Sequence, residues 1–153
     1  MITSATPTEF NIIFPADTAP GVNPFSARGL QGTLSPIAMA RGDDKLARTV
    51  NGTLVSLAAI QMRKYRVEIS GNDQAPPALD GLWVGMLVSV DCMVELAHRT
   101  GTVASRPGVP GSARVEGDYT YYQPRLSMLV VEYEVQRSEW AAEVSWSLAL
   151  EEV

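Results

Sequence analysis

The chain has 153 residues, of which 46% are hydrophobic and 19% are charged. This length suits one domain with a substantial core, and the composition excludes a wholly disordered chain, which would be poor in hydrophobic residues. Acidic residues outnumber basic ones by 17 to 12. An acidic domain repels phosphate backbones, so we expect no specific binding to nucleic acid.

Residues 1–27 are predicted to form an extended N-terminal arm, followed by a β-domain over 28–153. Four prolines interrupt any helix in the first 27 residues, yet large apolar side chains recur along this stretch. Such a segment suits an arm that lies on another surface, either its own domain or a neighbouring subunit. The candidate interface residues of the arm are Phe10, Ile12, Ile13, Phe14 and Phe25.

The first half of the domain is predicted to consist of short strands. Asn51-Gly52 lies between two β-forming triplets, which predicts a hairpin with a type I′ turn. Residues 56–62 suit a short helical turn, and alternation of apolar and polar side chains over 64–70 predicts a half-buried strand. Residues 71–86 form a long connection in which Trp83 is expected to plug the core.

The second half gives the stronger patterns. One strand is predicted over 88–96, with Asp91 and Glu95 on its solvated face, followed by an exposed loop over 99–118. Residues 119–135 are rich in β-formers, and the apolar parity changes near Leu129-Val130, which indicates either a bulge or burial on both faces. From Trp140 to Leu150 every second residue is apolar, which favours a strand over a helix.

These patterns predict an all-β fold. We expect an antiparallel β-sandwich or barrel of about six to eight strands, with an extended N-terminal arm and long loops. Amphipathic strands of this kind need a second layer to cover their apolar face.

No constellation of residues in the sequence indicates catalysis. His98 and Cys92 are the only residues of their types, and six residues along one strand separate them by about 20 Å. One cysteine and one histidine are too few for a zinc site, and one cysteine cannot form an intrachain disulfide. We therefore expect no enzymatic activity, no cofactor and no bound metal. Trp83, Tyr121 and Tyr122 leave open an alternative, a stacking platform for a carbohydrate or small molecule.

The start of the sequence has neither the charged nor the apolar region of a signal peptide, and no apolar run approaches the length of a membrane span. We therefore expect synthesis in a cytoplasm and no membrane association. The charge is uneven: residues 1–70 contain seven basic and five acidic residues, and residues 71–153 contain five and twelve. Either both portions lie in one domain, or the basic portion pairs with an acidic surface on a neighbouring subunit.

Three segments resemble the small β-rich structural proteins of tailed bacteriophage particles. They are the turn at 81–85 (GLWVG), the segment at 121–126 (YYQPRL) within the β-rich stretch 119–135, and the closing strand over 140–153. The resemblance implies a non-enzymatic virion component, made in the host cytoplasm, whose partners are copies of itself and other virion proteins. It implies a homo-oligomeric subunit of the tail, connector or baseplate; the alternative is a capsid decoration protein that bridges capsid subunits.

The arm and the loop at 99–118 are the predicted assembly elements, because both are costly to order alone. Arg106 and Arg114 in this loop are candidate interface residues, since the planar guanidinium suits protein interfaces. Deletion of residues 1–27 is expected to leave the domain folded and to weaken its assembly.

Overall fold

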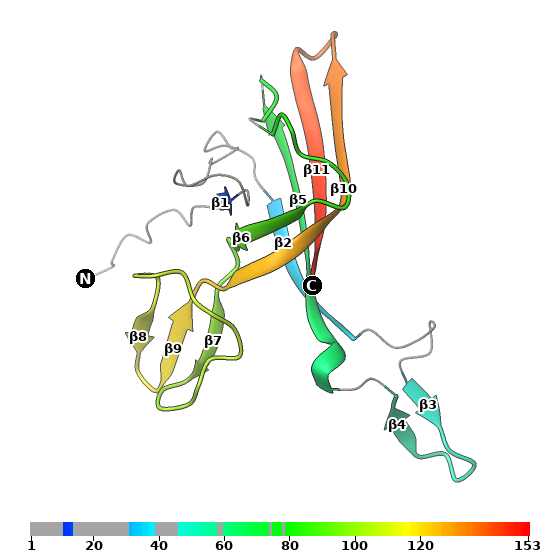
Figure 1. Ribbon diagram of the computed structural model, residues 1–153, viewed down its shortest axis with the longest axis vertical. Helices are drawn as coiled ribbons and strands as arrows, with labels where there is room; N and C mark the ends of the chain where they lie inside the picture. The colour runs from blue at the N-terminus through cyan, green and yellow to red at the C-terminus, as the bar shows by residue number, and fades with distance from the viewer. Residues whose placement is uncertain (1–10, 14–30, 39–45, 58–59, 74, 78) are drawn as a thin grey trace.

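The computed structural model describes residues 11–13, 31–38, 46–57, 60–73, 75–77 and 79–153. Within these ranges the protein is built from eleven β-strands and one 3-10 turn, η1 (Ile60–Met62). The all-β class is confirmed, and the turn falls within the predicted segment 56–62. Figure 1 shows one long curled sheet with smaller β-elements standing below it.

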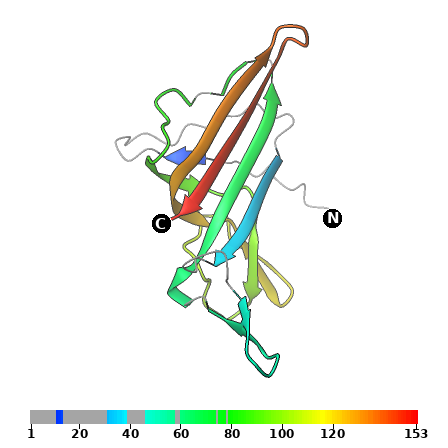
Figure 2. The same ribbon diagram turned by 90° about the vertical axis from the view of Figure 1, so that its right-hand side faces the viewer.

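Six strands form the large sheet, and every pair within it is antiparallel. Their order is β1 (Asn11–Ile13), β6 (Leu87–Asp91), β10 (Arg125–Ser138), β11 (Glu143–Glu152), β5 (Arg63–Asp73) and β2 (Gln31–Ala38). Figure 2 shows β10, β11, β5 and β2 side by side along the length of the molecule.

The inner face of this sheet carries the core. Val67 and Ile69 on β5 lie opposite Leu150 and Leu148 on β11, and all four side chains are buried. The same face continues across β10, β6 and β1, where its buried members are Leu126, Met128, Val130, Val88, Val90 and Ile12. Leu79 and Leu82, from the connection between β5 and β6, join this core from outside the sheet.

A bulge in β10 produces the curl. The register runs Val130 opposite Leu150 and then Glu132 opposite Ala149, so Val131 has no partner residue on β11. A bulge bends its strand and increases the local twist. Before it, β10 lies between β6 and β11; beyond it, β10 continues beside β11 alone. Of the two explanations offered for the parity change near Leu129-Val130, the structure shows the bulge.

The alternating segment at the end of the chain is confirmed as a strand. Val144, Trp146, Leu148 and Leu150 on β11 all face the core and are buried. Trp140 is the exception: it lies before β11, in the turn that follows β10, and is fully exposed.

Two smaller sheets complete the described structure. The first is the hairpin of β3 (Leu46–Arg48) and β4 (Leu54–Ser56), and the second has the order β7 (Leu96–Arg99), β9 (Tyr119–Tyr122) and β8 (Arg114–Glu116). The predicted strand over 88–96 is therefore wrong as one element: its first half belongs to the large sheet and its end to a small one. The predicted loop over 99–118 likewise contains β8.

The turn of the β3–β4 hairpin differs from the predicted type I′. Gly52 has a φ of 81°, whereas Ala142 is the only non-glycine residue with a positive φ in the described part of the chain. The Gly52 amide donates to the Thr49 carbonyl at 2.8 Å. Asn51 therefore keeps a negative φ, as in a type I turn followed by a left-handed glycine, which is the common three-residue hairpin loop.

Candidate assembly surfaces

The structure places the predicted arm residues in two groups. Phe10, Phe14 and Phe25 lie outside the described residues. Ile12 and Ile13 belong to β1, which pairs with β6, and Ile12 is 0% exposed opposite Val90. Ile12 is thus a core residue of its own chain.

This placement corrects the expectation for deletion of residues 1–27. The deletion removes an edge strand together with a fully buried side chain, so it lowers the stability of the domain itself. Large-to-small changes at fully buried aliphatic side chains already cost about 2–5 kcal/mol. Loss of assembly in that truncated protein would therefore not isolate a role for the arm.

Arg106 fastens its loop to the large sheet of the same chain. Its Nε donates to Glu152 Oε1 at 2.6 Å, and its Nη2 donates to Glu152 Oε2 at 3.1 Å and to the Arg63 carbonyl at 2.8 Å. Its guanidinium carbon lies 5.3 Å from the centre of the Tyr65 ring. The hydrogen bonds to Glu152 raise the pKa of Arg106 above its ordinary value. These contacts make Arg106 an internal clamp.

Arg114 is also engaged within its chain, at the small three-stranded sheet. It forms ion pairs with Glu95 at 2.9 Å and Glu116 at 3.2 Å, and its guanidinium lies 4.7 Å from the centre of the Tyr121 ring. Its side chain is exposed. The hydrogen bond to Glu95 is the largest influence that raises the pKa of Arg114.

An ion pair that the sequence did not reveal joins β6 to β10. Arg125 donates from Nε to Asp91 Oδ1 at 2.6 Å and from Nη2 to Asp91 Oδ2 at 2.9 Å. Asp91 is only 5% exposed, so its predicted place on a solvated face is wrong. The hydrogen bonds to Asp91 raise the pKa of Arg125. A bidentate pair of this kind fixes the two strands where the chain leaves the large sheet.

The alternative of an aromatic platform built from Trp83, Tyr121 and Tyr122 is not supported by their placement. Tyr122 is buried, with its ring edge-on to His98 at 5.7 Å between centroids, and Arg114 lies over Tyr121. Trp83 is 76% exposed, which corrects the expectation that it plugs the core; Leu79 and Leu82 of the same connection are buried instead. Only Trp83 of the three therefore offers a free aromatic face.

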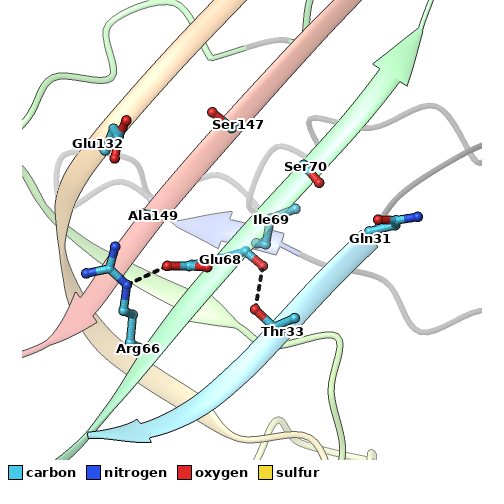
Figure 3. A pocket seen from close by; sticks show the side chains of 9 residues that line it. All are labelled: Gln31, Thr33, Arg66, Glu68, Ile69, Ser70, Glu132, Ser147 and Ala149. Atoms are coloured by element: carbon cyan, nitrogen blue, oxygen red, sulfur yellow. Dashed lines mark hydrogen bonds and ion pairs between the residues drawn. The ribbon is translucent and has the colours of Figure 1, made fainter.

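The outer face of the large sheet contains a shallow hollow of about 330 Å³ (Figure 3). It is lined from β2, β5, β10 and β11 by Gln31, Thr33, Arg66, Glu68, Ile69, Ser70, Glu132, Ser147 and Ala149. Arg66 pairs with Glu68 at 2.7 Å and with Glu151 at 2.6 Å. Two carboxylates thus neutralise the one cation of the hollow, so it is a weak place for an anionic ligand.

Comparison with family models, with curated proteins and with solved structures gives no match to this chain. No three His, Cys, Asp or Glu side chains gather as a metal site requires within the described ranges. Of the helical segments that the structure describes, none has the length and hydropathy of a membrane-spanning helix.

The most conspicuous surface is the β3–β4 hairpin, which Figure 1 shows projecting below the large sheet. Among the described strands, β3 and β4 pair only with each other. Its large apolar side chains are exposed, as are those just after it: Leu46, Val50, Leu54, Val55, Leu57 and Ile60.

Proposed function

We propose that this protein is a non-enzymatic structural subunit that acts by assembling with copies of itself and with companion proteins. One observation carries the proposal: an apolar two-stranded hairpin projects from the domain. An isolated hairpin is at best marginally stable in water, and contiguous apolar surface on a soluble protein marks an interaction site. The hairpin gains stability when a partner surface covers it.

The assembly in which we place the subunit is the particle of a tailed bacteriophage, in its tail, connector or baseplate. The resemblance of residues 81–85, 121–126 and 140–153 to the small β-rich proteins of such particles supports this assignment. A curled sheet with apolar projections suits a subunit that contacts two neighbours. The alternative is a capsid decoration protein, whose projections would contact capsid subunits instead.

Sedimentation velocity and negative-stain electron microscopy of the purified protein test the proposal. A tail or connector subunit forms closed rings or stacked oligomers by itself. A decoration protein stays small in solution and binds to isolated capsids. A protein that remains monomeric and binds neither capsids nor tails refutes a structural role in the particle.

The role of the arm needs a truncation that spares β1. Removal of residues 1–10 leaves Asn11–Ile13 in place beside β6, so the core keeps Ile12. If the arm contributes to assembly, this truncated protein keeps the circular dichroism spectrum of the full chain and forms smaller oligomers. Unchanged oligomers would exclude residues 1–10 from the interface.

A further inference from the structure

The β3–β4 hairpin combines apolar exposure with positive charge. Leu46 and Leu54 are more than half exposed, and Val50 at the turn is fully exposed. Arg48 is the one charged residue between Leu46 and Ser56, so the hairpin carries a net charge of +1. A partner surface for this hairpin should therefore be apolar at its centre and acidic around it.

A surface of that kind lies on the same chain, at the bulge of β10. We call it the bulge patch and define it as Trp83, Val84, Leu87, Leu129 and Val131, all of which are exposed. Leu87 and Leu129 are directly opposite each other across β6 and β10.

Hydrogen bonds hold the turn that carries Trp83 and Val84 against the bulge. The Gly85 amide donates to the Val130 carbonyl at 2.7 Å, and the Val130 amide donates to the Met86 carbonyl at 3.0 Å. These bonds extend the pairing of β6 with β10 as far as the residue before Val131. The five members of the patch therefore lie in one small region of the molecule.

The surroundings of the bulge patch are acidic. Glu132 directly follows Val131 in β10 and is exposed. Asp80 lies in the turn that precedes Trp83 and is exposed. The hairpin carries the opposite charge, +1 from Arg48.

We propose that the β3–β4 hairpin of one copy docks on the bulge patch of the next copy, in a head-to-tail contact. The proposal rests on the self-assembly proposed above and names the surfaces that carry it. The two surfaces differ and belong to separate parts of the fold (Figure 1), so one contact leaves a hairpin free on one copy and a patch free on the other. A heterologous contact of this kind builds a closed ring or an open filament.

Charge complementarity favours a second copy as the occupant of the patch. Two hairpins facing each other bring Arg48 against Arg48, and two patches bring Asp80 and Glu132 against the same two carboxylates. Only the hairpin-to-patch arrangement covers apolar surface on both sides while it brings opposite charges together.

Crosslinking between two single-cysteine variants tests the contact directly. The one native thiol, Cys92, is buried and its pKa is raised to about 12, so an engineered exposed cysteine reacts alone. We expect Leu54→Cys mixed with Leu87→Cys to give a crosslinked dimer with a short bis-maleimide, and neither variant to do so alone. Val103→Cys, at a fully exposed position between β7 and β8, is the matched control.

Sedimentation of charge variants gives an independent test. Leu54→Asp and Leu87→Asp each place a carboxylate in an exposed strand position of one surface. Each should raise the dissociation constant of self-association about tenfold or more. An equimolar mixture should form dimers, because the unaltered hairpin of Leu87→Asp can still dock on the unaltered bulge patch of Leu54→Asp. Val103→Asp should leave assembly unchanged. Circular dichroism checks that each variant keeps its strands.

The outcomes separate this inference from the function on which it rests. Crosslinks formed by Leu54→Cys alone show a hairpin-to-hairpin contact and overturn the head-to-tail arrangement. Oligomers of wild-type size in both charge variants show that the protein assembles through other surfaces, which overturns the inference and leaves the proposed function intact. A wild-type protein that is monomeric at every concentration overturns both.

Discussion

Substitution of Gly71 by alanine gives a sharp test of the packing on the inner face. Gly71 on β5 lies opposite Trp146 on β11, and a Cβ built on it would be 2.9 Å from Trp146 Cζ2. That is about 0.6 Å inside the optimal carbon–carbon separation of about 3.5 Å. The indole is buried in the core, so it cannot move aside freely. Overpacking of this kind costs about 1–3 kcal/mol.

Alanine also gains about 0.5–1 kcal/mol over glycine in a strand, because the unfolded chain loses freedom. The net expectation for Gly71→Ala is a loss of about 1–2 kcal/mol, or about 3–6 °C in Tm for a domain of this size. Urea unfolding followed by far-ultraviolet circular dichroism, at a concentration where sedimentation gives one species, measures the difference.

Gly32→Ala is the matched control, since its Cβ would meet Met93 Sδ and lie 3.0 Å from Met93 Cγ, atoms of a flexible and only partly buried side chain that can shift. It should change stability by less than about 0.5 kcal/mol. In the background Trp146→Phe, which removes the indole atoms nearest Gly71, the cost of Gly71→Ala should shrink, as a double-mutant cycle would show. Equal stability of the two glycine variants, or strict additivity with Trp146→Phe, would refute the packing argument.

Three other predictions concern separate contacts. Arg125→Ala leaves the Asp91 carboxylate buried without its partner. Because Arg125 is itself partly exposed, we expect the free energy of unfolding to fall by about 2 kcal/mol, which is less than for a fully buried pair. Urea unfolding measures this loss. Arg106→Ala removes the clamp to Glu152, so hydrogen exchange over residues 100–112 should accelerate, and stability should fall by about 1–2 kcal/mol; unchanged exchange would show that the loop is held by other contacts. Burial raises the pKa of the Cys92 thiol from 9.0 to about 12, so Ellman's reagent at about pH 8 should react only after unfolding. Between pH 9 and 12 the Cys92 thiol is ionised in the unfolded chain but still neutral in the folded protein. The contribution of this thiol to the free energy of unfolding is therefore full below pH 9 and is lost as the pH rises toward 12. Cys92→Ala should reduce that loss.

The patterns that could be predicted from the sequence are those set by local geometry. Alternation of apolar and polar side chains over 144–150 is the pattern of a strand with one buried face. In the structure Val144, Trp146, Leu148 and Leu150 are all buried. The parity change near Leu129-Val130 is the signature of an extra residue in β10, which the register shows as Val131. Both depend on neighbours in the chain, so no knowledge of distant contacts was needed.

The patterns that failed depend on contacts distant in the sequence. Alternation continues smoothly through residues 88–96 although the chain passes from one sheet to another after Asp91, because side-chain parity does not say which strand is the neighbour. The burial of Asp91 requires Arg125, which lies 34 positions away. In the connection over 71–86 the sequence pattern does not show which apolar side chain is buried: Leu79 and Leu82 join the core, whereas Trp83 is exposed.

The longer open edge of the large sheet is protected against pairing with an added strand. Within the described ranges β1 and β2 each pair on one side only, so the curled sheet has two open edges. Pro36 on β2 lies opposite Tyr65, whose amide donates toward β11, to Glu152 Oε2 at 3.0 Å. In an antiparallel ladder the Pro36 nitrogen then faces the free edge. A proline there removes a donor that an incoming strand would need, which is a common protection against edge pairing. The proposed head-to-tail contact accordingly uses apolar side chains of the β3–β4 hairpin and the bulge patch, and it adds no strand at β2.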